Sequence, residues 1–501
     1  MNIVSSFRMK EIDRISIEER GFGGLLLMEN AGIRILQAAE SAVDFSGKRP
    51  VVCAAGSGNN GGDALVIARQ IFSLMENPVT IVITKENGTE SFEFHLNLCR
   101  NLGIRIIKAE DSESETEAYQ KIEDAEIIFD GLSGTGVNGP LREPAAALTE
   151  RINASKAYKL SIDIPSGIGD QFRSGYPAVD ADFTFTVGRP KRCMYLPEAR
   201  PFCGIIHTVR IGFPRDLLNA SGCESDGRDW QLVTDSDAEQ MMPELSPGDY
   251  KNSRGHLAVF AGSPGTSGAA SLCAEAALRT STGLVSLFAD SDSYAVLAAK
   301  HQAVMVKPAP EGEAAVPDLS RYQAAAAGPG WGVTDRRTAQ LKKIIAGSRG
   351  VLDADAVTLL AGITAETGNP PDLEGRWVLT PHPGEFRRLF PDFDIAADPY
   401  SAVAAAAERL NAVVLLKGIT TFIAAADGRS AVVDGCYPRL GTAGSGDVLC
   451  GIIGGYAASG VELFDAAVLG AAVHLRAAKL CGEERQWFTA DELLNYTGRS
   501  F

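Results

Sequence analysis

Short apolar runs rich in valine and isoleucine recur along the first part of the chain, separated by segments whose apolar positions follow the helical period. Runs of this length that are apolar on both faces are typical of strands buried in a parallel sheet, with helices as the crossovers. The pattern predicts strands at residues 51–55, 79–83, 104–107, 126–130, 158–163, 183–187 and 205–211. The first part of the chain is therefore expected to be a Rossmann-like α/β unit.

The same alternation restarts further along the chain after an interruption. Residues 219–229 are small and polar without periodicity, which is typical of a linker. Strands are then predicted at 256–261, 284–288, 322–327, 350–353, 377–379 and 413–417, with alanine-rich helices between them at 268–280 and 402–410. We therefore expect a first domain at 1–218, a linker at 219–233 and a second α/β domain at 234–501.

Composition and charge exclude several classes of function. The chain has 501 residues, a formal charge of −16 and 45% hydrophobic residues. An acidic surface does not replace the counterions of nucleic acid, so no nucleic-acid partner is expected. The start of the chain turns charged too early for a signal peptide, and no run approaches 18 apolar residues, so we expect a cytoplasmic protein without a membrane partner. Nine scattered cysteines without CxxC pairs indicate reduced thiols.

A glycine-rich turn near the C-terminus indicates phosphoryl chemistry. Residues 441–447 read Gly-Thr-Ala-Gly-Ser-Gly-Asp and run directly into an apolar helical segment. Glycines allow close approach of the backbone to an anion, and the helix start directs its free N–H groups to the same point. Asp447 stands beside those donors, where a carboxylate can take a proton from an attacking hydroxyl. A lone motif of this kind is more often a structural helix cap, and its setting favours the chemical interpretation.

The first domain carries glycine, asparagine and aspartate at the ends of three predicted strands. Residues 56–63 read Gly-Ser-Gly-Asn-Asn-Gly-Gly-Asp, and Asp130 and Asp163 end two later strands. Ligands of open α/β sheets bind at this edge, so the three loops are expected to converge. These loops contain no basic residue, so donors to a phosphate are expected to be backbone N–H groups of residues 134–139.

Together with Met-Glu-Asn-Ala-Gly at 28–32 and Ile-Asp-Ile-Pro-Ser-Gly at 162–167, these loops resemble the NAD(P)H-hydrate epimerase family over residues 9–213. The resemblance implies that Asp163 lies near the damaged ring and that Asn60, Asp130 and Ser166 ligate a potassium ion. The residues implied to hold the hydrated nucleotide are Asn59, Asn60, Gly61, Gly62, Asp63, Gly134, Thr135, Gly136, Val137, Asn138, Gly139, Pro140 and Asp163.

The implied reaction is inversion at C6 of the hydrated nicotinamide ring. This carbon bears the hydroxyl and is also bonded to nitrogen, so it can epimerise through reversible loss of its substituent. One acid/base group near the ring is sufficient. Asp163 is the predicted group, because burial at a strand end would keep its proton available.

Five further motifs precede Asp447 in the second domain, in the order expected of a nucleotide site built on one sheet. They lie at residues 251–271, 327–330, 352–356, 379–386 and 417–421. Each alone is weak: Lys417 at a strand end is more often a solvated lysine, and His382 between two prolines is more often a rigid-turn residue. The combination is what indicates a site.

Thr-Pro-His-Pro-Gly-Glu at 380–385 together with Gly-Ser-Gly-Asp at 444–447 resembles the ADP-dependent NAD(P)H-hydrate dehydratase family, which has a ribokinase-like fold, over residues 248–482. The resemblance implies that Gly330, His382 and Asp447 contact the hydrate and that Ala269 and Ala270 line the pocket. The residues implied to contact the adenine nucleotide are Lys417, Gly418, Ile419, Thr420, Thr421 and Gly446.

ADP is the implied co-substrate, because hydroxide leaves poorly from a neutral C6 alcohol whereas a phosphate ester leaves readily. Asp447 is predicted to accept the hydroxyl proton, and backbone N–H groups of residues 443–446 to stabilise the transferred phosphoryl group. Magnesium is expected without a dedicated ligand in the sequence, and Glu385 is one candidate.

The favoured hypothesis is a fused repair enzyme acting on hydrated NADH and NADPH (NADHX and NADPHX) with ADP. The epimerase half would be an isomerase, and the dehydratase half would be a lyase. One alternative is a ribokinase-like small-molecule kinase, of a vitamin or sugar, fused to a ligand-binding domain. Another is that the first domain is a catalytically idle protein-binding module, against which its converging acids argue. A homo-oligomer is expected, and the preference between NADH and NADPH hydrates stays open.

Overall fold

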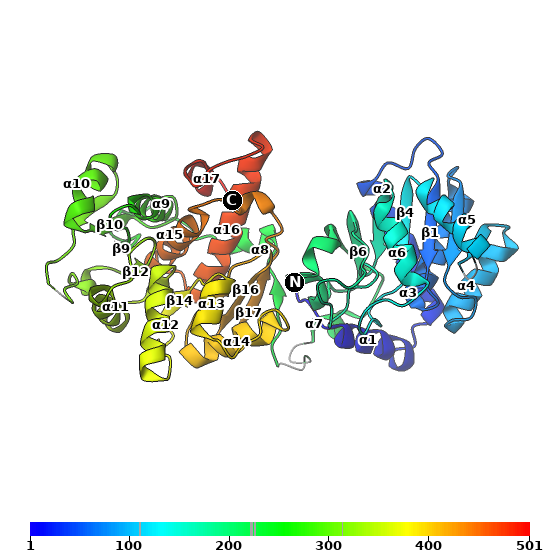
Figure 1. The fold of residues 1–501 in the computed structure, drawn as a ribbon, viewed down its shortest axis with the longest axis horizontal. Coiled ribbons are helices and arrows are strands. Elements are labelled where there is room, and N and C mark those ends of the chain that lie inside the picture. The colour runs from blue at the N-terminus through cyan, green and yellow to red at the C-terminus, as the bar shows by residue number, and fades with distance from the viewer. Residues whose placement is uncertain (110–111, 221–223, 225–226, 313, 501) are drawn as a thin grey trace. The chain divides into compact units, whose positions relative to one another are not determined.

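The computed structural model describes residues 1–109, 112–220, 224, 227–312 and 314–500, which form two compact α/β units. The first unit is Asn2–Asp229, and the second is Trp230–Phe501 together with Met1. Figure 1 shows each as a sheet covered by helices. The second unit begins at Trp230, inside the segment 219–233 where the sequence predicts a linker. Residues 221–223, 225 and 226 of that segment lie outside the described residues.

The sheet of the first unit has seven strands in the order β3-β2-β1-β4-β5-β6-β7. Every pair of neighbouring strands is parallel. The strands are β1 (Val51–Ala55), β2 (Val79–Ile83), β3 (Arg105–Lys108), β4 (Ile127–Gly131), β5 (Tyr158–Ile162), β6 (Phe183–Val187) and β7 (Ile205–Val209). All seven predicted strands are confirmed, with ends that differ by at most two residues.

Helices cover both faces of this sheet, so the central strands are buried on both sides, as their apolar runs predict. One core joins β1 to α2, α3 and α4, and a second core joins the opposite face of β1 to α5 and α6. The helices are α1 (Ser6–Arg14), the π-helix η1 (Ile15–Glu19), α2 (Gly24–Ala42), α3 (Asn59–Leu74), α4 (Glu90–Asn101), α5 (Ser112–Glu123), α6 (Ala145–Ala154), the 3₁₀ turns η2 (Arg192–Tyr195) and η3 (Arg200–Cys203), and α7 (Arg215–Asn219).

The sheet of the second unit has ten strands in the order β11-β10-β9-β12-β13-β14-β15-β16-β17-β8. The strands are β8 (Gln231–Leu232), β9 (His256–Phe260), β10 (Leu284–Ala289), β11 (Met305–Pro308), β12 (Ala324–Ala327), β13 (Gly350–Leu352), β14 (Trp377–Leu379), β15 (Val413–Leu416), β16 (Thr421–Ala425) and β17 (Ser430–Val433). The six predicted strands are confirmed. The sequence interpretation missed β8 and β11, and also β16 and β17, which form an antiparallel hairpin directly after β15. No helix separates β15, β16 and β17 from one another, so the alternation of strands and helices gives no signal for β16 and β17.

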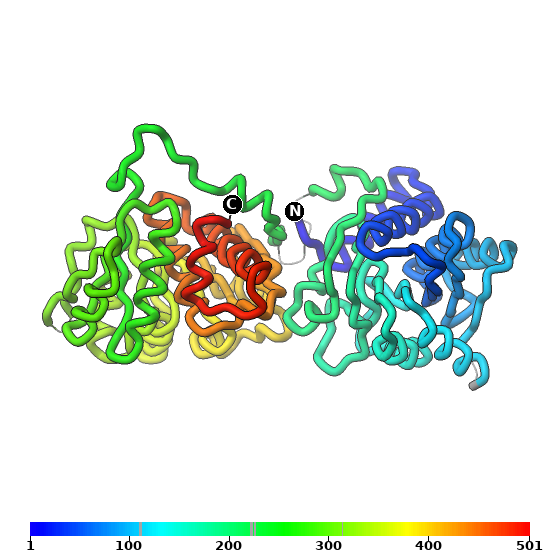
Figure 2. Tube along the Cα trace, turned by 90° about the horizontal axis from the view of Figure 1, so that it is seen from above, coloured from blue at the N-terminus to red at the C-terminus, as the bar shows by residue number. Residues whose placement is uncertain are grey.

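The helices of the second unit include α15, the helix that begins at the glycine-rich turn. They are α8 (Asp235–Met241), α9 (Ser267–Leu278), α10 (Ser291–Lys300), the 3₁₀ turn η4 (Leu319–Arg321), α11 (Asp335–Gly347), α12 (Asp355–Thr367), α13 (Pro383–Leu389), α14 (Pro399–Leu410), the 3₁₀ turn η5 (Pro438–Leu440), α15 (Ser445–Ala458), α16 (Leu463–Glu484) and α17 (Ala490–Thr497). α15 packs against α9, α16 and α17, the last two forming the red end of the tube in Figure 2.

Two further predictions concern cysteines and membranes. The eight cysteines within the described residues form no disulfide bond, and Cys223 lies outside those residues. In the described part of the chain, no helix combines the length and the apolar character that crossing a bilayer requires.

Candidate active sites

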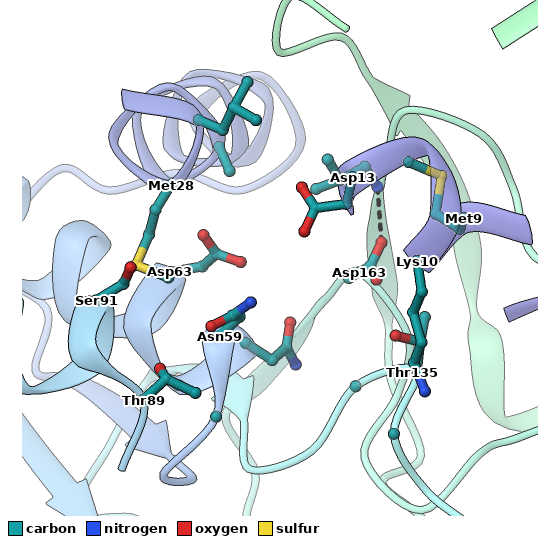
Figure 3. A pocket seen from close by; sticks show the side chains of 18 of the residues that line it. Met9, Lys10, Asp13, Met28, Asn59, Asp63, Thr89, Ser91, Thr135 and Asp163 are labelled. Carbon is teal, nitrogen blue, oxygen red and sulfur yellow. Dashed lines mark hydrogen bonds between the residues drawn. The ribbon is translucent and has the colours of Figure 1, made fainter. Parts of the chain in front are cut away.

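A cavity of about 600 Å³ lies at the carboxyl edge of the first sheet, where the sequence predicts that the loops converge. Of the residues implied to hold the nucleotide, its lining includes Asn59, Asn60, Gly61, Asp63, Gly134, Thr135, Gly136, Val137 and Asp163. Figure 3 shows Asn59, Asp63, Thr135 and Asp163 around the same open space. The described lining does not include Gly62, Asn138, Gly139 or Pro140. A side chain at Gly62 would instead meet the sulfur of Met28 at 2.5 Å.

The first turn of α3 forms one wall of the cavity because glycine allows it to pack closely on the preceding turn. A Cβ at Gly61 would lie 1.7 Å from the carbonyl oxygen of Gly56, so any larger residue would push the helix start away. The sequence Gly-Asn-Asn-Gly-Gly-Asp is therefore a packing requirement as well as a source of polar groups. It fixes the positions of Asn60 and Asp63 relative to the sheet.

Asp163 is held in place by a buried lysine. It follows β5 with a positive φ of 64°, an uncommon conformation for a residue other than glycine. Its carboxylate accepts a hydrogen bond from the Val187 amide (2.9 Å) and forms an ion pair with Lys191. The Lys191 ammonium is fully buried and also donates to Thr186 Oγ1 (3.0 Å) and Val187 O (2.8 Å). The strand-end position predicts burial of Asp163, and the ion pair with Lys191 is what the fold adds.

Two basic residues reach the cavity from outside the three loops. Lys10 and Lys191 both line the cavity, although neither belongs to the loops that the sequence analysis compared. Lys191 lies after β6, and only the packing of β6 beside β5 brings it to Asp163. A signal for it existed only as a lone lysine in Arg-Pro-Lys, which is not specific.

Two more carboxyl groups face this cavity. Burial and the neighbouring Asp163 raise the pKa of Asp13, in α1. Burial, followed by the charges of Asp163 and Asp13, raises the pKa of Asp63 well above its usual range, and Lys191 opposes this shift. A carboxyl whose pKa is raised keeps its proton to a higher pH than usual, which suits a catalytic acid.

Asn60, Asp130 and Ser166, the residues implied to ligate potassium, meet around the backbone of Ser133. Asn60 Nδ2 donates to Ser133 O (2.7 Å), and Ser166 Oγ donates to Asp130 Oδ1 (2.5 Å). Asp130 is fully buried and also accepts from Ser161 Oγ (2.8 Å) and the Ser166 amide (2.9 Å). Burial raises the pKa of Asp130, and these hydrogen bonds lower it in part. The cluster consists of oxygen ligands around a buried carboxyl with which no described lysine or arginine pairs, which is suited to a hard monovalent cation.

The second candidate site surrounds a buried ion pair at the carboxyl edge of the second sheet. Asp353, which follows β13, accepts hydrogen bonds from Lys417 Nζ (2.7 Å) and Thr380 Oγ1 (2.8 Å). Burial lowers the pKa of Lys417, but the attraction of Asp353 outweighs it and the net shift is upward. Lys417 is therefore a fixed cation at the strand end and not a solvated surface lysine.

Asp447 lies in the first turn of α15, next to this pair. Burial, followed by the charge of Asp353, raises the pKa of Asp447 to about 6, against the opposing effect of Lys417. A Cβ at Gly446 would lie 3.5 Å from Lys417 Nζ, so the backbone at the start of α15 passes directly beside the ammonium group. The structure thus brings together Asp447, Gly446 and Lys417, as the sequence analysis predicts. It adds Asp353, a strand-end acid to which that analysis gave no role.

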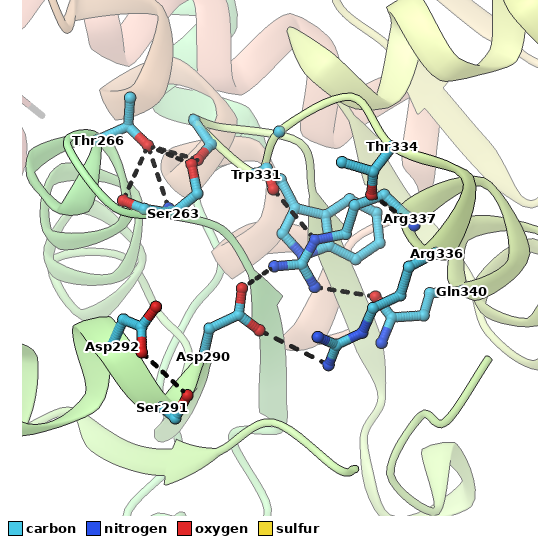
Figure 4. A network of polar contacts seen from close by, with 12 residues as sticks. Ser263, Thr266, Asp290, Ser291, Asp292, Trp331, Thr334, Arg336, Arg337 and Gln340 are labelled. Carbon is cyan, nitrogen blue, oxygen red and sulfur yellow. Dashed lines mark hydrogen bonds and ion pairs between the residues drawn. The ribbon is translucent and has the colours of Figure 1, made fainter. Parts of the chain in front are cut away.

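Hydrogen bonds from two side chains hold the turn that carries Gly330. Figure 4 shows these side chains, Thr266 and Arg337, with Trp331 of the same turn. Thr266 Oγ1 donates to Gly330 O (2.7 Å), and Arg337 Nε donates to Trp331 O (3.1 Å) while its guanidinium forms an ion pair with Asp290. Gly330 has a φ of 55°, and a Cβ there would lie 3.1 Å from Ala269 Cβ. Gly330 and Ala269 are therefore neighbours. Ala270 is buried beneath them, beside Gly262.

His382 caps α13 and does not contact the Asp353 pair through any described hydrogen bond. Its Nδ1 accepts from the Gly384 amide (2.9 Å), while Glu385 accepts from the His382 amide (2.8 Å). Because Nδ1 accepts, Nε2 carries the proton of the neutral ring. It lies 3.4 Å from Glu385 Oε1, on a side chain that is 55% accessible. Glu385 is close enough to Lys417 to raise the pKa of that lysine.

The residues expected to contact the adenine nucleotide form the turn between β15 and β16. Gly418, Ile419 and Thr420 make the turn, and Thr421 is the first residue of β16. Thr420 is buried and its hydroxyl has no hydrogen-bond partner among the described residues. The turn therefore follows Lys417 at the end of β15 and leads into β16.

Family models match both parts of the chain. Residues 24–193 match the model described as YjeF-related protein N-terminus, and residues 257–499 match the model described as NAD(P)H-hydrate dehydratase. The predicted fold class, a Rossmann-like unit followed by a ribokinase-like unit, is confirmed by these models together with the two largely parallel sheets.

Relatives named bifunctional NAD(P)H-hydrate repair enzyme Nnr match along nearly the whole chain. The relative from Moorella thermoacetica is 30% identical over 99% of this chain and 96% of its own length. The relative from Gloeobacter violaceus is 34% identical over 89% of this chain and 86% of its own length. Among solved structures, an ADP/ATP-dependent NAD(P)H-hydrate dehydratase from Bacillus subtilis, co-crystallised with ATP and magnesium, is 24% identical, covers 54% of this chain and 97% of that chain, and has a TM-score of 0.48. With both of its parts and nearly its full length matched, this chain belongs to the family of bifunctional NAD(P)H-hydrate repair enzymes.

Proposed function

We propose that this chain repairs hydrated NADH and NADPH in two steps, one in each unit. The first unit interconverts the R and S forms at C6, and the second dehydrates the S form at the expense of ADP, releasing AMP and phosphate. Membership of the repair family supports both steps. The observation that carries the proposal is the position of Asp447 at the start of α15, beside Lys417 and Asp353.

For the first step, the cavity of about 600 Å³ supplies the space and Asp163 the acid/base group. The ring nitrogen lone pair expels the C6 substituent, which then returns to the other face. Asp163, fixed by Lys191 and the Val187 amide, is positioned to take the proton of the returning water. Thr135 and the backbone of residues 134–137 line the same cavity and would bind the rest of the nucleotide.

Potassium is proposed for the first unit on the basis of the oxygen cluster of Asn60, Asp130, Ser133 and Ser166. A bound potassium ion would neutralise the buried Asp130 carboxyl and tie together the loops that form the cavity floor. Replacing potassium by tetramethylammonium should lower the melting temperature of the first unit. That of the second unit should not change.

For the second step, Asp447 accepts the C6 hydroxyl proton while the oxygen attacks the terminal phosphoryl group of ADP. A carboxyl with a pKa of about 6 is ionised at neutral pH and still basic enough for this transfer. Lys417 and the amide groups at the start of α15, which lie side by side, would stabilise the charge that develops on the phosphoryl oxygens. The phosphate ester then leaves with help from the ring nitrogen.

Magnesium would neutralise the phosphates of ADP when bound, and Glu385 is the candidate ligand because it lies near Lys417. The turn from Lys417 to Thr421 is proposed to bind the adenine nucleotide, and Gly330, Ala269 and His382 the hydrate. A cytoplasmic location and a homo-oligomer stay predictions, the latter testable by light scattering coupled to size-exclusion chromatography.

The test is recovery of the near-ultraviolet absorbance of reduced nicotinamide from a mixture of R and S hydrates in the presence of ADP. Wild-type protein should recover the whole mixture. Asp447→Ala should recover nothing, and Asp163→Ala should stall near the S fraction. A chain that phosphorylates a vitamin or sugar alcohol and recovers no reduced nucleotide would be the alternative kinase.

A further inference from the structure

The cavity of the first unit holds two more carboxyl groups, those of Asp13 and Asp63, than the epimerase chemistry has so far used. Asp63 projects from the N-terminal part of α3, whereas Asp163 follows β5 and Asp13 belongs to α1. Figure 3 shows the carboxyl groups of Asp63 and Asp13 directed into the same open space, with Asp163 on the side away from α3. A ring in this space would therefore have Asp63 and Asp163 on opposite faces.

The charges around Asp63 differ from those around Asp163. Among the described residues, the amino groups that line the cavity are those of Lys10, which is exposed, and Lys191, which is committed to Asp163. No described residue donates a hydrogen bond to the Asp63 carboxyl. Burial and the carboxylates of Asp163 and Asp13 raise the pKa of Asp63 well above its usual range. Two carboxyls in one cavity with such different surroundings are suited to opposite roles, one holding a proton and the other accepting one.

We propose that Asp63 is a second catalytic residue, the acid that protonates the departing hydroxyl on the ring face opposite to Asp163. This inference rests on the proposed epimerase function. In the forward step the N1 lone pair forms the N1=C6 bond, the C6–O bond breaks, and the hydroxyl leaves as water with the Asp63 proton. Water then adds to C6 on the other face, the N1=C6 electrons return to nitrogen, and Asp163 takes the proton that the water loses.

Asp13 is the group that returns the proton from Asp163 to Asp63. After one inversion the proton lies on Asp163, and Asp63 is ionised, so the proton must return before the next turnover. Asp13 is electrostatically coupled to both Asp163 and Asp63 and lines the same cavity, so its carboxyl is near enough to both to carry the proton back. The return needs no oxidant, metal or further substrate, and it leaves the number of protons unchanged.

The variant Asp63→Asn tests the proposal in the full chain, with the R hydrate of NADH as substrate and without ADP, so that the second unit is silent. Conversion to the S form is followed by chromatography. Loss of the proton donor should lower the turnover number by about 100-fold or more, while KM changes by less than about threefold. The limb of the wild-type pH profile on which the rate falls as pH rises should be absent from the variant.

Rescue separates acid catalysis from a role in shape. Formate should raise the epimerisation rate of Asp63→Ala by about tenfold or more over its rate without formate. A small carboxylic acid can occupy the vacated space and donate the proton. Asp63→Glu should retain more activity than Asp63→Asn. Asp124→Asn, the same chemical change on an exposed residue just after α5, is the matched control and should leave the rate unchanged.

Turnover of Asp63→Asn within about threefold of wild type, or a loss carried wholly by KM, would overturn the role of Asp63 and leave the epimerase function standing. A wild-type chain that never converts R to S would overturn the epimerase function, and the inference with it. If Asp63→Asn fails to fold, formate rescue of Asp63→Ala and the activity of Asp63→Glu decide the question. An absence of rescue together with an inactive Asp63→Glu counts against the proposal.

Discussion

Asp447 shows how one carboxyl acquires its chemistry from its neighbours. Burial and the charges of Asp353 and Asp355 raise its pKa, and Lys417 opposes them, with a result of about 6. A base with this pKa is ionised at neutral pH and retains affinity for a proton, which suits attack by an alcohol on a phosphoryl group. The same surroundings make the ionised carboxylate costly to bury.

Asp447→Asn should therefore abolish dehydration and yet stabilise the second unit. The folded-state pKa of about 6 is above the ordinary value of 3.8, so the wild type loses stability as pH rises through this interval. Asparagine removes the cost, and because the site is partly open to solvent we expect a gain of about 1–2 kcal/mol at pH 8. Thermal unfolding at both ends of the interval measures it. A gain of equal size at pH 4 would contradict the electrostatic explanation.

Asp353→Asn should shift the pH dependence of the dehydration rate. It removes the negative charge that raises the pKa of Asp447 and releases Lys417 to pair with Asp447, and both changes favour the ionised form. The acid limb of kcat/KM should move down by about one pH unit, with a lower plateau because Asp447 becomes a weaker base. Asp427→Asn, in the exposed turn after β16, is the control and should leave the limb in place. An unmoved limb in Asp353→Asn would remove Asp353 from this role.

At the level of helices, the position of Asp447 depends on how closely α15 approaches α9. Gly451 permits the approach: a Cβ there would lie 2.1 Å from Cys273 O and 2.8 Å from Ala276 Cβ. Gly362 in α12 is a contrasting glycine, since it is exposed and a Cβ would meet nothing within 4 Å. Helix packing thus requires glycine at position 451, whereas no packing contact requires it at position 362.

The paired substitutions test this difference. Gly451→Ala should destabilise the second unit by about 2–3 kcal/mol and lower dehydratase activity, because α15 must move away from α9. Gly362→Ala should stabilise the same unit by about 0.5–1 kcal/mol through helix propensity. Urea unfolding of the two variants against wild type gives both values. Equal effects of the two substitutions would show that helix packing is not the cause.

The chain as a whole consists of two units with separate cores, and its second unit starts earlier than the predicted boundary at 234. Trp230 is fully buried, with its ring 5.0 Å from that of Tyr400 and 6.1 Å from that of Phe422. β8 follows at once and pairs with β17. The last residues of the segment predicted as a linker thus complete the edge of the second sheet.

Trp230→Ala should lower the stability of the second unit by about 3–5 kcal/mol and leave the first unit unchanged. Scanning calorimetry of the full chain should resolve the two transitions and show that only one moves. Trp487→Ala is the matched control, since that tryptophan is 77% exposed and its loss should change neither transition. A shift of both transitions in Trp230→Ala would mean that the units unfold as one.

Much of this architecture could be predicted from local patterns. The apolar runs predicted thirteen strands and the α/β class. The order of motifs around Asp163 and Asp447 indicated the family. These features are short-range: a strand needs a buried run, and a helix start needs its turn and cap. The signal was weak for β8, which has two residues and pairs with the distant strand β17, and for β11, which ends at a proline.

Contacts between distant residues required the fold. Lys191 reaches Asp163 only because β6 lies beside β5, and Asp353 reaches Lys417 only because β13, β14 and β15 are adjacent. Charge states follow from such neighbours and from burial, which chain position does not encode locally. Residue types and their spacing were enough to indicate the family and two candidate sites. The sheets alone decided which carboxyl in each site pairs with a lysine and which is left to carry a proton, because electrostatic energies depend on distance in space and on exclusion of water.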